Sequence, residues 1–258
     1  MAIALKTPEQ IKRMREAGQL VRLVLNRLGE MIAPGVTTEK LDVEAERLCR
    51  SKGAQPLFKG VPGRGRAGPF PGSICCSLND EVVHGIPSAD RVIRDGDIVS
   101  VDFGVKLAGW CGDAAETFVC GNVPPEVRRL VDVTRQSLAI AVEMTRPGLM
   151  WSTIAAAIQS YVEAEGFSVV REFVGHGIGS EMHEDPKVPN CILPEFRSRD
   201  ILLAEGMVLA VEPMVNLGSA DVKIASDGWT VVTSDGMPSA HFEHMLGITS
   251  TGVTVLTE

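Results

Sequence analysis

The sequence predicts an α+β domain made of two similar halves, about 8–122 and 123–258, in which helices cover an antiparallel sheet. Two observations support this prediction. A pair of helices recurs in the same order along the chain, and each pair is followed by a β-rich run that ends in a carboxylate. With 258 residues, the chain is long enough for one large domain with a sizeable core. We therefore expect residues 1–258 to form a single domain.

The first helix is predicted to begin after Thr7. Thr7 can cap it, Pro8 suits the first helical position, and Gln10 completes a capping box. Apolar residues follow at roughly helical spacing, and the dipeptide Pro34-Gly35 ends the pattern. A second helix is predicted from about residue 39 to residue 52, and it ends at Gly53.

The same order of elements returns in the second half. A third helix is predicted from near Pro125 to before Pro147, and a fourth from about residue 152 to residue 165. Five positions match at a constant offset of 113 residues, which chance alone does not readily produce. Met31, Pro34, Gly35, Leu41 and Gly53 correspond to Met144, Pro147, Gly148, Ile154 and Gly166.

Each half also places two acids on strands that otherwise have a buried pattern. The run 96–102 ends in Asp102, and the run 206–212, which lies 110 residues later, ends in Glu212. Alternation puts Asp102 on the face opposite the apolar residues of its strand. Asp113 is expected on the next strand of a hairpin, and Glu243 within a strand over 241–248.

Buried carboxylates without partners are costly, so these four acids need cations. Salt bridges are one explanation, but few lysines or arginines lie in these segments. Lys106 and Lys223 are the nearest candidates. Metal coordination is the better explanation, because four carboxylates and one histidine balance two divalent ions. The natural nitrogen ligand is His176, in Gly175-His176-Gly177-Ile178-Gly179, where glycines let the backbone approach a ligand closely.

Taken together, the motifs of this chain resemble those of the methionine aminopeptidases, in particular the short bacterial type I form. The resemblance covers about residues 6–257, and its motifs are highly specific in combination. They are Asn79-Asp80-Glu81-Val82-Val83-His84-Gly85-Ile86-Pro87, Asp102 with Gly112-Asp113, Gly175-His176-Gly177-Ile178-Gly179, Glu212-Pro213-Met214 and Phe242-Glu243-His244.

This resemblance implies the "pita-bread" fold and a dinuclear metallohydrolase that removes the initiator methionine from nascent proteins and peptides. It implies two divalent ions per chain, either cobalt, manganese, iron or zinc, which activate a bridging water. Asp113 and Glu243 would bridge the ions, Asp102 would bind one of them, and His176 and Glu212 would bind the other.

The resemblance also implies roles for residues around the ions. Glu212 is expected to act as the general base. His84 and His183 are expected to face the substrate, as donors to the scissile amide and to the tetrahedral intermediate. The methionine side chain is expected to bind in an apolar pocket lined by Phe70, Cys75, Met182 and Trp229, although ordinary core packing also explains these four residues.

Two segments depart from the family pattern. The basic Gly/Pro-rich loop 60–71 is longer than usual, and it carries Phe70 where the family usually has tyrosine. We expect a surface loop, and contact of Arg64 or Arg66 with substrate or ribosomal RNA is a second hypothesis. His241 stands where glutamine is common, and we expect it to support the ligands rather than to bind metal.

Composition limits the location and partners of the protein. A net charge of −8 argues against general DNA or RNA binding. No apolar run approaches the roughly 18 residues of a membrane span, and the N-terminus does not resemble a signal peptide. Six cysteines without a Cys-x-x-Cys pair fit a reducing compartment. We expect a cytoplasmic monomer that acts on nascent N-termini, with the ribosome as a candidate partner.

Two other functions fit parts of the pattern. A proline-directed aminopeptidase or dipeptidase of the same fold would share the metal ligands, but such chains usually carry an additional N-terminal domain. A non-catalytic binding module on the same fold would have lost ligands, whereas all five are present here. Metal content and peptide hydrolysis distinguish these alternatives.

Overall fold

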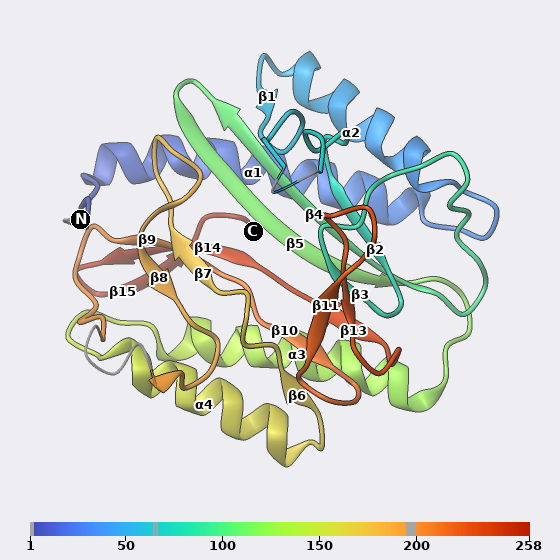
Figure 1. Ribbon diagram of the computed structural model, residues 1–258. Helices are drawn as coiled ribbons and strands as arrows, with labels where there is room; N and C mark the ends of the chain where they lie inside the picture. The colour runs from blue at the N-terminus through green and yellow to red at the C-terminus, as the bar shows by residue number, and fades with distance from the viewer. Residues whose placement is uncertain (1–2, 64, 66, 195–199) are drawn as a thin grey trace.

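The computed structural model describes residues 3–63, 65, 67–194 and 200–258. Within these residues, four long helices form two pairs that lie on opposite sides of the strands in Figure 1. The members of each pair pack against each other. The pairs are α1 (Pro8–Met31) with α2 (Thr38–Ser51), and α3 (Pro125–Met144) with α4 (Trp151–Ala164).

The helix ends follow the local signals in the sequence. The Thr7 hydroxyl accepts a hydrogen bond from the Gln10 backbone N–H, and the Gln10 side chain accepts one from the Thr7 N–H. This reciprocal pair is the capping box expected at the start of α1. Thr37 and Met150 precede α2 and α4, and each forms an isolated antiparallel bridge, to Val92 and Leu202 respectively. The repeat of the sequence therefore extends to these bridges.

The first half contains a four-stranded antiparallel sheet with the order β1-β4-β2, in which β5 also pairs with β4. The long hairpin of β4 and β5 crosses Figure 1 diagonally and packs on α1. Alternate residues of β4 point into the core beneath α1 and α2, as the sequence predicted. The bounds are β1 (Gln55–Pro56), β2 (Cys75–Leu78), β4 (Ile98–Leu107) and β5 (Trp110–Val119).

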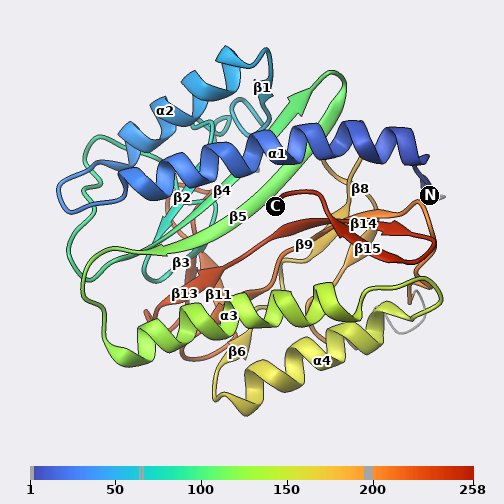
Figure 2. The same cartoon turned by 180° about the vertical axis from the view of Figure 1, so that it is seen from behind.

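The second half contains a five-stranded sheet with the order β15-β14-β9-β7-β8, and its strands lie beside α3 and α4 in Figure 2. Two three-stranded sheets, β13-β10-β6 and β11-β12-β3, complete the described strands. The bounds are β3 (Glu81–Val83), β6 (Ser168–Val169), β7 (Gly175–Gly177), β8 (Glu184–Val188), β9 (Val208–Val211), β10 (Met214–Asn216), β11 (Val222–Ile224), β12 (Val231–Thr233), β13 (Ser239–His241), β14 (His244–Thr249) and β15 (Gly252–Val255).

The expectation that Glu243 lies within a strand is wrong. Glu243 lies in a break between β13 and β14, and this break faces an equivalent one at Glu212-Pro213, between β9 and β10. Proline has no N–H to donate to a ladder, so Pro213 interrupts the pairing at this point. The Glu243 N–H instead donates to the Ala115 carbonyl of β5 at 2.9 Å. Glu212 and Glu243 therefore lie at the junction between the β9–β14 pair and the β10–β13 pair.

None of the helices in the described part of the chain is both long and apolar enough to cross a lipid bilayer. All six cysteines are buried, as is common for free cysteine, which packs as a small apolar residue.

Candidate metal centre

Asp102 and Asp113 come from neighbouring strands of the first half. Asp102 lies on β4 opposite Ala115, and Asp113 lies on β5 opposite Gly104. Because residues two apart share a face of a strand, this register places both carboxylates on the same face of the hairpin. Opposite Asp113, the absence of a side chain at Gly104 leaves room for the Phe58 ring. A Cβ at Gly104 would lie only 2.8 Å from this ring.

His176 reaches the same region from β7, and the glycines beside it explain why its backbone fits there. A Cβ at Gly175 would lie 2.2 Å from the Ala210 carbonyl oxygen, and one at Gly177 would lie 2.2 Å from the Asp185 carbonyl oxygen. Any larger residue at either position would push the neighbouring strands apart. The glycines thus allow the close strand packing that carries His176 into the site.

The imidazole of His176 is oriented by its own backbone. Its Nδ1 lies 2.9 Å from the carbonyl oxygen of Gly177, which can only accept a hydrogen bond, so Nδ1 carries the proton. The lone pair of Nε2 then points towards the acids, 3.8 Å from Asp113 Oδ2 and 3.7 Å from Glu212 Oε1. This is the orientation that a metal-binding histidine requires.

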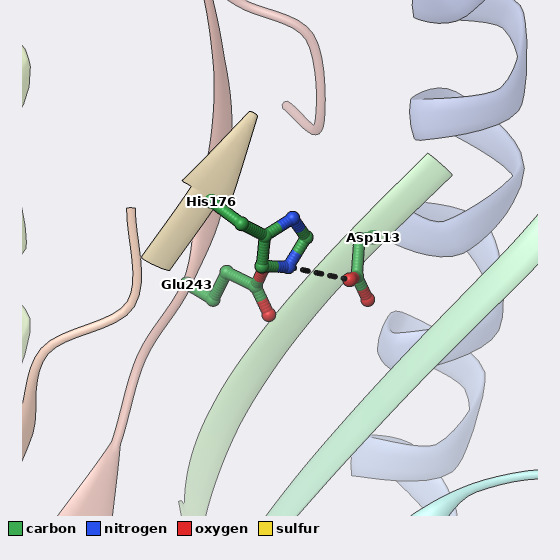
Figure 3. A group of neighbouring side chains, drawn as sticks. All are labelled: Asp113, His176 and Glu243. Atoms are coloured by element: carbon green, nitrogen blue, oxygen red, sulfur yellow. Dashed lines mark ion pairs between the residues drawn. The ribbon is translucent and has the colours of Figure 1, made fainter. Parts of the chain in front are cut away.

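Figure 3 shows Asp113 of β5, His176 of β7 and Glu243 of the segment between β13 and β14 converging on one point. One potential ligand atom from each of these buried residues lies within 4.8 Å of the other two. Asp102 and Glu212 line the same cavity as these three. The structure therefore brings together all five residues that the resemblance implied as ligands.

The acids of this cluster are strongly destabilised as anions. Burial raises the pKa of Asp102 to about 7. Burial, followed by repulsion from the neighbouring carboxylates, raises the pKa values of Asp113, Glu212 and Glu243 well above their usual range. Burial lowers the pKa of His176 to about 4, so its imidazole is neutral at physiological pH. Neutral imidazole and carboxylate oxygens are the donors that divalent metals prefer.

Salt bridges do not compensate these acids. Among the described residues, no lysine or arginine makes an ion pair with Asp102, Asp113, Glu212 or Glu243. Asp102 Oδ1, Asp113 Oδ1 and Glu243 Oε1 are buried oxygens without a hydrogen-bond donor. Such groups are costly unless a cation satisfies them. The cluster therefore fits metal binding. Of the two explanations that the sequence offered for the buried acids, salt bridges and metal coordination, it favours metal coordination.

We expect the stability of the metal-free protein to fall as the pH rises. The pKa of Asp102 is 3.8 in the unfolded chain and about 7 in the folded one, so the folded state binds more protons between about pH 4 and pH 7. The free energy of unfolding then decreases across this window. A bound divalent cation favours the ionised carboxylates and should remove the decrease. Thermal unfolding of chelator-treated and metal-loaded protein across this range tests the prediction.

The matched control is the Asp102→Asn variant, which lacks the titrating group and should show a shallower decrease when metal-free. A decrease of equal slope in the metal-free and metal-loaded proteins would contradict the prediction.

A cavity of about 440 Å³ opens directly onto the acids. One wall is apolar and comes from Val61, Pro62 and Phe70, from β2 and from the turn before β12. Phe70 and Cys75 are buried there, and the ring of Phe70 packs edge-on against Trp229 with centroids 5.1 Å apart. Met182 completes this wall. The structure thus places all four residues of the expected methionine pocket in one cavity.

His84 and His183 line the same cavity. The ring of His183 is exposed and lies 4.4 Å from that of His176, centroid to centroid. His84 follows β3 with a positive φ of 60°, and its ring packs on Phe173. The guanidinium of Arg91 holds the loop of His84 in place by donating to the backbone carbonyls on both sides of it.

Comparison with protein-family models matches residues 12–250 to metallopeptidase family M24. The chain belongs to this family. Methionine aminopeptidase 1 of Bacillus subtilis is 50% identical over 255 residues, which cover 99% of each chain. The methionine aminopeptidase of Clostridium acetobutylicum is 48% identical, over 99% of this chain and 98% of its own. The resemblance identified in the sequence is therefore confirmed.

Solved structures agree with this membership. The methionine aminopeptidase of Rickettsia prowazekii superposes with a TM-score of 0.93 at 38% identity, and each chain is covered completely. The enzyme of Thermotoga maritima gives a TM-score of 0.92 at 40% identity, again over the full length of both. A prolidase of Pyrococcus furiosus has a TM-score of 0.77 at 21% identity and shares the fold alone. The pita-bread fold is thus confirmed.

Several residues of the M24 cavity had no signal in the sequence. They are apolar residues from separate loops and strands, and nothing in their local patterns distinguishes them from ordinary core residues. Only the tertiary structure brings them to the mouth and walls of the cavity. They are Phe58, Val61, Pro62, Phe173, Val174, Ile224 and Val231.

His241 lies behind the acids of this M24 site. It is almost completely buried, and its Nε2 has no hydrogen-bond partner and lies 4.0 Å from Glu212 Oε2. Burial lowers the pKa of His241 to about 3, so the ring is neutral. Its place beside Glu212 agrees with the supporting position expected from the sequence. Arg64 and Arg66, the other departure from the family pattern, lie outside the described residues.

Proposed function

We propose that this protein removes the N-terminal methionine from nascent proteins and peptides, in a reaction that depends on two divalent metal ions. The observation that carries the proposal is the convergence of four buried acids and a neutral histidine at one side of an apolar cavity. The names of the full-length relatives support the same activity.

Asp102, Asp113, His176, Glu212 and Glu243 hold the ions in this proposal. Four carboxylates balance the charge of two divalent cations, and the donor set accommodates cobalt, manganese, iron or zinc. When bound, such ions lower the pKa of water so that hydroxide is available near neutral pH.

The side chains around the ions handle the proton and the substrate. Glu212, ionised when the ions are bound, accepts a proton from water and passes it towards the leaving amine. The rings of His84 and His183 donate hydrogen bonds to the scissile amide and to the developing oxyanion. The free α-amine of the substrate would bind beside the ligands of one ion, which restricts the enzyme to N-termini.

The apolar wall selects the first residue. Phe70 and Trp229 offer aromatic surface to a methionine side chain, and the Cys75 thiol and Met182 thioether add polarisable contacts. Among the described residues that line the cavity, the charged and imidazole groups are those of His84, His183 and the five candidate ligands. A long unbranched apolar side chain therefore fits this wall better than a charged one.

Hydrolysis of Met-Ala-Ser and Ala-Pro-Ser by metal-free protein, before and after addition of cobalt or manganese, tests this proposal. We expect metal-dependent release of methionine from Met-Ala-Ser alone. Cleavage of Ala-Pro-Ser alone would move the protein to the proline-directed peptidases. Absence of cleavage of both peptides would favour a binding module, and metal analysis would show whether that module still holds ions.

We further propose that the protein acts in the cytoplasm as a monomer on nascent chains, in contact with the ribosome and without binding DNA. Its net charge of −8 supports the absence of general nucleic-acid binding. Sedimentation of the purified protein, alone and with ribosomes, tests the oligomeric state and the ribosomal contact together.

A further inference from the structure

A buried ion pair joins the N-terminal segment to the loop that carries His183. Lys6 Nζ lies 2.6 Å from Glu184 Oε2, and the two side chains are only 6% and 17% exposed. The Lys6 ammonium also donates to the Ala4 carbonyl, and the Lys6 backbone N–H donates to the Gly206 carbonyl at 2.7 Å. Hydrogen bonds therefore fix both the backbone and the ammonium group of Lys6, so the ammonium is a rigid partner for the Glu184 carboxylate.

The second oxygen of the same carboxylate organises the loop itself. Glu184 Oε1 accepts a hydrogen bond from the Glu181 backbone N–H at 3.2 Å. The Glu181 carbonyl in turn accepts one from the Gly179 N–H, and the Gly179 carbonyl accepts one from the Cys111 N–H of β5. Glu184 thus connects Lys6 on one side with the folded turn 179–184 on the other.

Gly179, the last glycine of the Gly-His-Gly-Ile-Gly motif, is explained by this ion pair. A Cβ at Gly179 would lie 2.3 Å from Glu184 Oε1 and 2.7 Å from Lys6 Cε. The first two glycines of the motif admit neighbouring backbone, whereas the third makes room for the ion pair. The motif therefore serves both the ligand His176 and the turn that follows it.

His183 depends on this turn for its position. It directly precedes Glu184, and the residue is exposed, so apart from the contact of its ring with His176 the turn fixes its position. Its neighbour on the other side, Met182, lines the methionine pocket. A shift of the turn would move both the proposed hydrogen-bond donor and one wall of the pocket.

We propose that Lys6 is a positioning residue for His183, and that it acts through Glu184. This inference rests on the proposed function, in which His183 donates to the reacting group. Lys6 lies 178 residues from Glu184 in sequence and does not line the cavity, so it touches neither substrate nor metal. Misplacement of a reacting group by about 1 Å can cost on the order of 100-fold in rate.

The test compares Lys6→Met, which keeps length and removes the charge, with Lys6→Arg, which restores it. We expect Lys6→Met to lower kcat for Met-Ala-Ser by at least about tenfold, with a smaller change in KM and unchanged metal content. Lys6→Arg should recover much of this loss. Amide hydrogen exchange of residues 179–184, which needs no activity, should become faster in Lys6→Met.

The decisive comparison is a double-mutant cycle with His183→Ala. If Lys6 acts through His183, adding Lys6→Met to His183→Ala should lower kcat by less than about twofold. Arg22→Met is the matched control, because Arg22 and Glu116 form a partly buried ion pair, 21% and 22% exposed, between α1 and β5. We expect this control to leave kcat unchanged.

Additive losses of kcat in the cycle, or a loss in Arg22→Met equal to that in Lys6→Met, would overturn the proposal and indicate a general effect on stability. Unchanged hydrogen exchange of 179–184 would also overturn it. If Lys6→Met does not fold, Glu184→Gln makes the same comparison from the other partner. Failure of the unmodified protein to cleave Met-Ala-Ser would instead count against the proposed function, and the exchange measurement would still report on the turn.

Discussion

Replacing Asp113 with asparagine is expected to lower kcat/KM for Met-Ala-Ser by more than about 1,000-fold, because it removes a charged oxygen from the centre of the acidic cluster. Asp113 is 2% exposed, and one of its oxygens, 3.8 Å from His176 Nε2, belongs to the group that could hold a metal. The metal content of the purified variant, measured by mass spectrometry, should fall together with the activity.

The same substitution should have the opposite effect on the metal-free protein. Repulsion from Asp102 contributes to the raised pKa of Asp113, and an uncharged amide relieves it. The melting temperature of chelator-treated Asp113→Asn should therefore equal or exceed that of the unmodified protein. Asp90→Asn, at an exposed position, is the control and should change neither property. Full activity and metal content in Asp113→Asn would exclude Asp113 as a ligand.

The second large effect is expected for His183→Ala. Loss of one preorganised donor to an oxyanion typically costs about 100- to 1,000-fold in kcat. We expect a loss of this size with unchanged metal content, because His183 lies beside His176 but outside the group of mutually close ligand atoms. Steady-state kinetics with metal-loaded protein, combined with metal analysis, distinguishes a role of His183 in the reaction from a role in metal binding.

Ser180→Ala, an exposed substitution in the same turn, is the control for this experiment and should retain kcat. His183→Gln keeps a side-chain N–H donor and should recover part of the rate. An unchanged kcat in His183→Ala would remove His183 from the reaction, and loss of metal from that variant would assign it to the ligands instead.

Much of this molecule could be predicted from local signals. The capping box at Thr7 and the glycine and proline signals after each helix located all four long helices to within a few residues. Helices depend on contacts within a few residues, so short motifs suffice to place them. Alternation on β4 likewise predicted which side of the strand faces the core.

Long-range pairing was harder to predict. Alternation suggested a strand through Glu243, whereas the structure breaks it there and bonds the Glu243 N–H to Ala115 of β5. The sequence near Glu243 does not indicate this break, because the residue that interrupts the pairing is Pro213, on the neighbouring strand segment.

By itself, the sequence determined the repeat, the helices and the set of five acidic and imidazole residues, because buried carboxylates and a glycine-flanked histidine are conspicuous in apolar runs. Only the tertiary structure decided how they converge within a few ångströms, and which ordinary apolar residues, such as Phe58 and Ile224, form the cavity wall. It alone pairs Lys6 with Glu184. The physical reason is that such contacts depend on how distant segments pack. The sequence around a common apolar or charged residue does not indicate which distant residue it will contact.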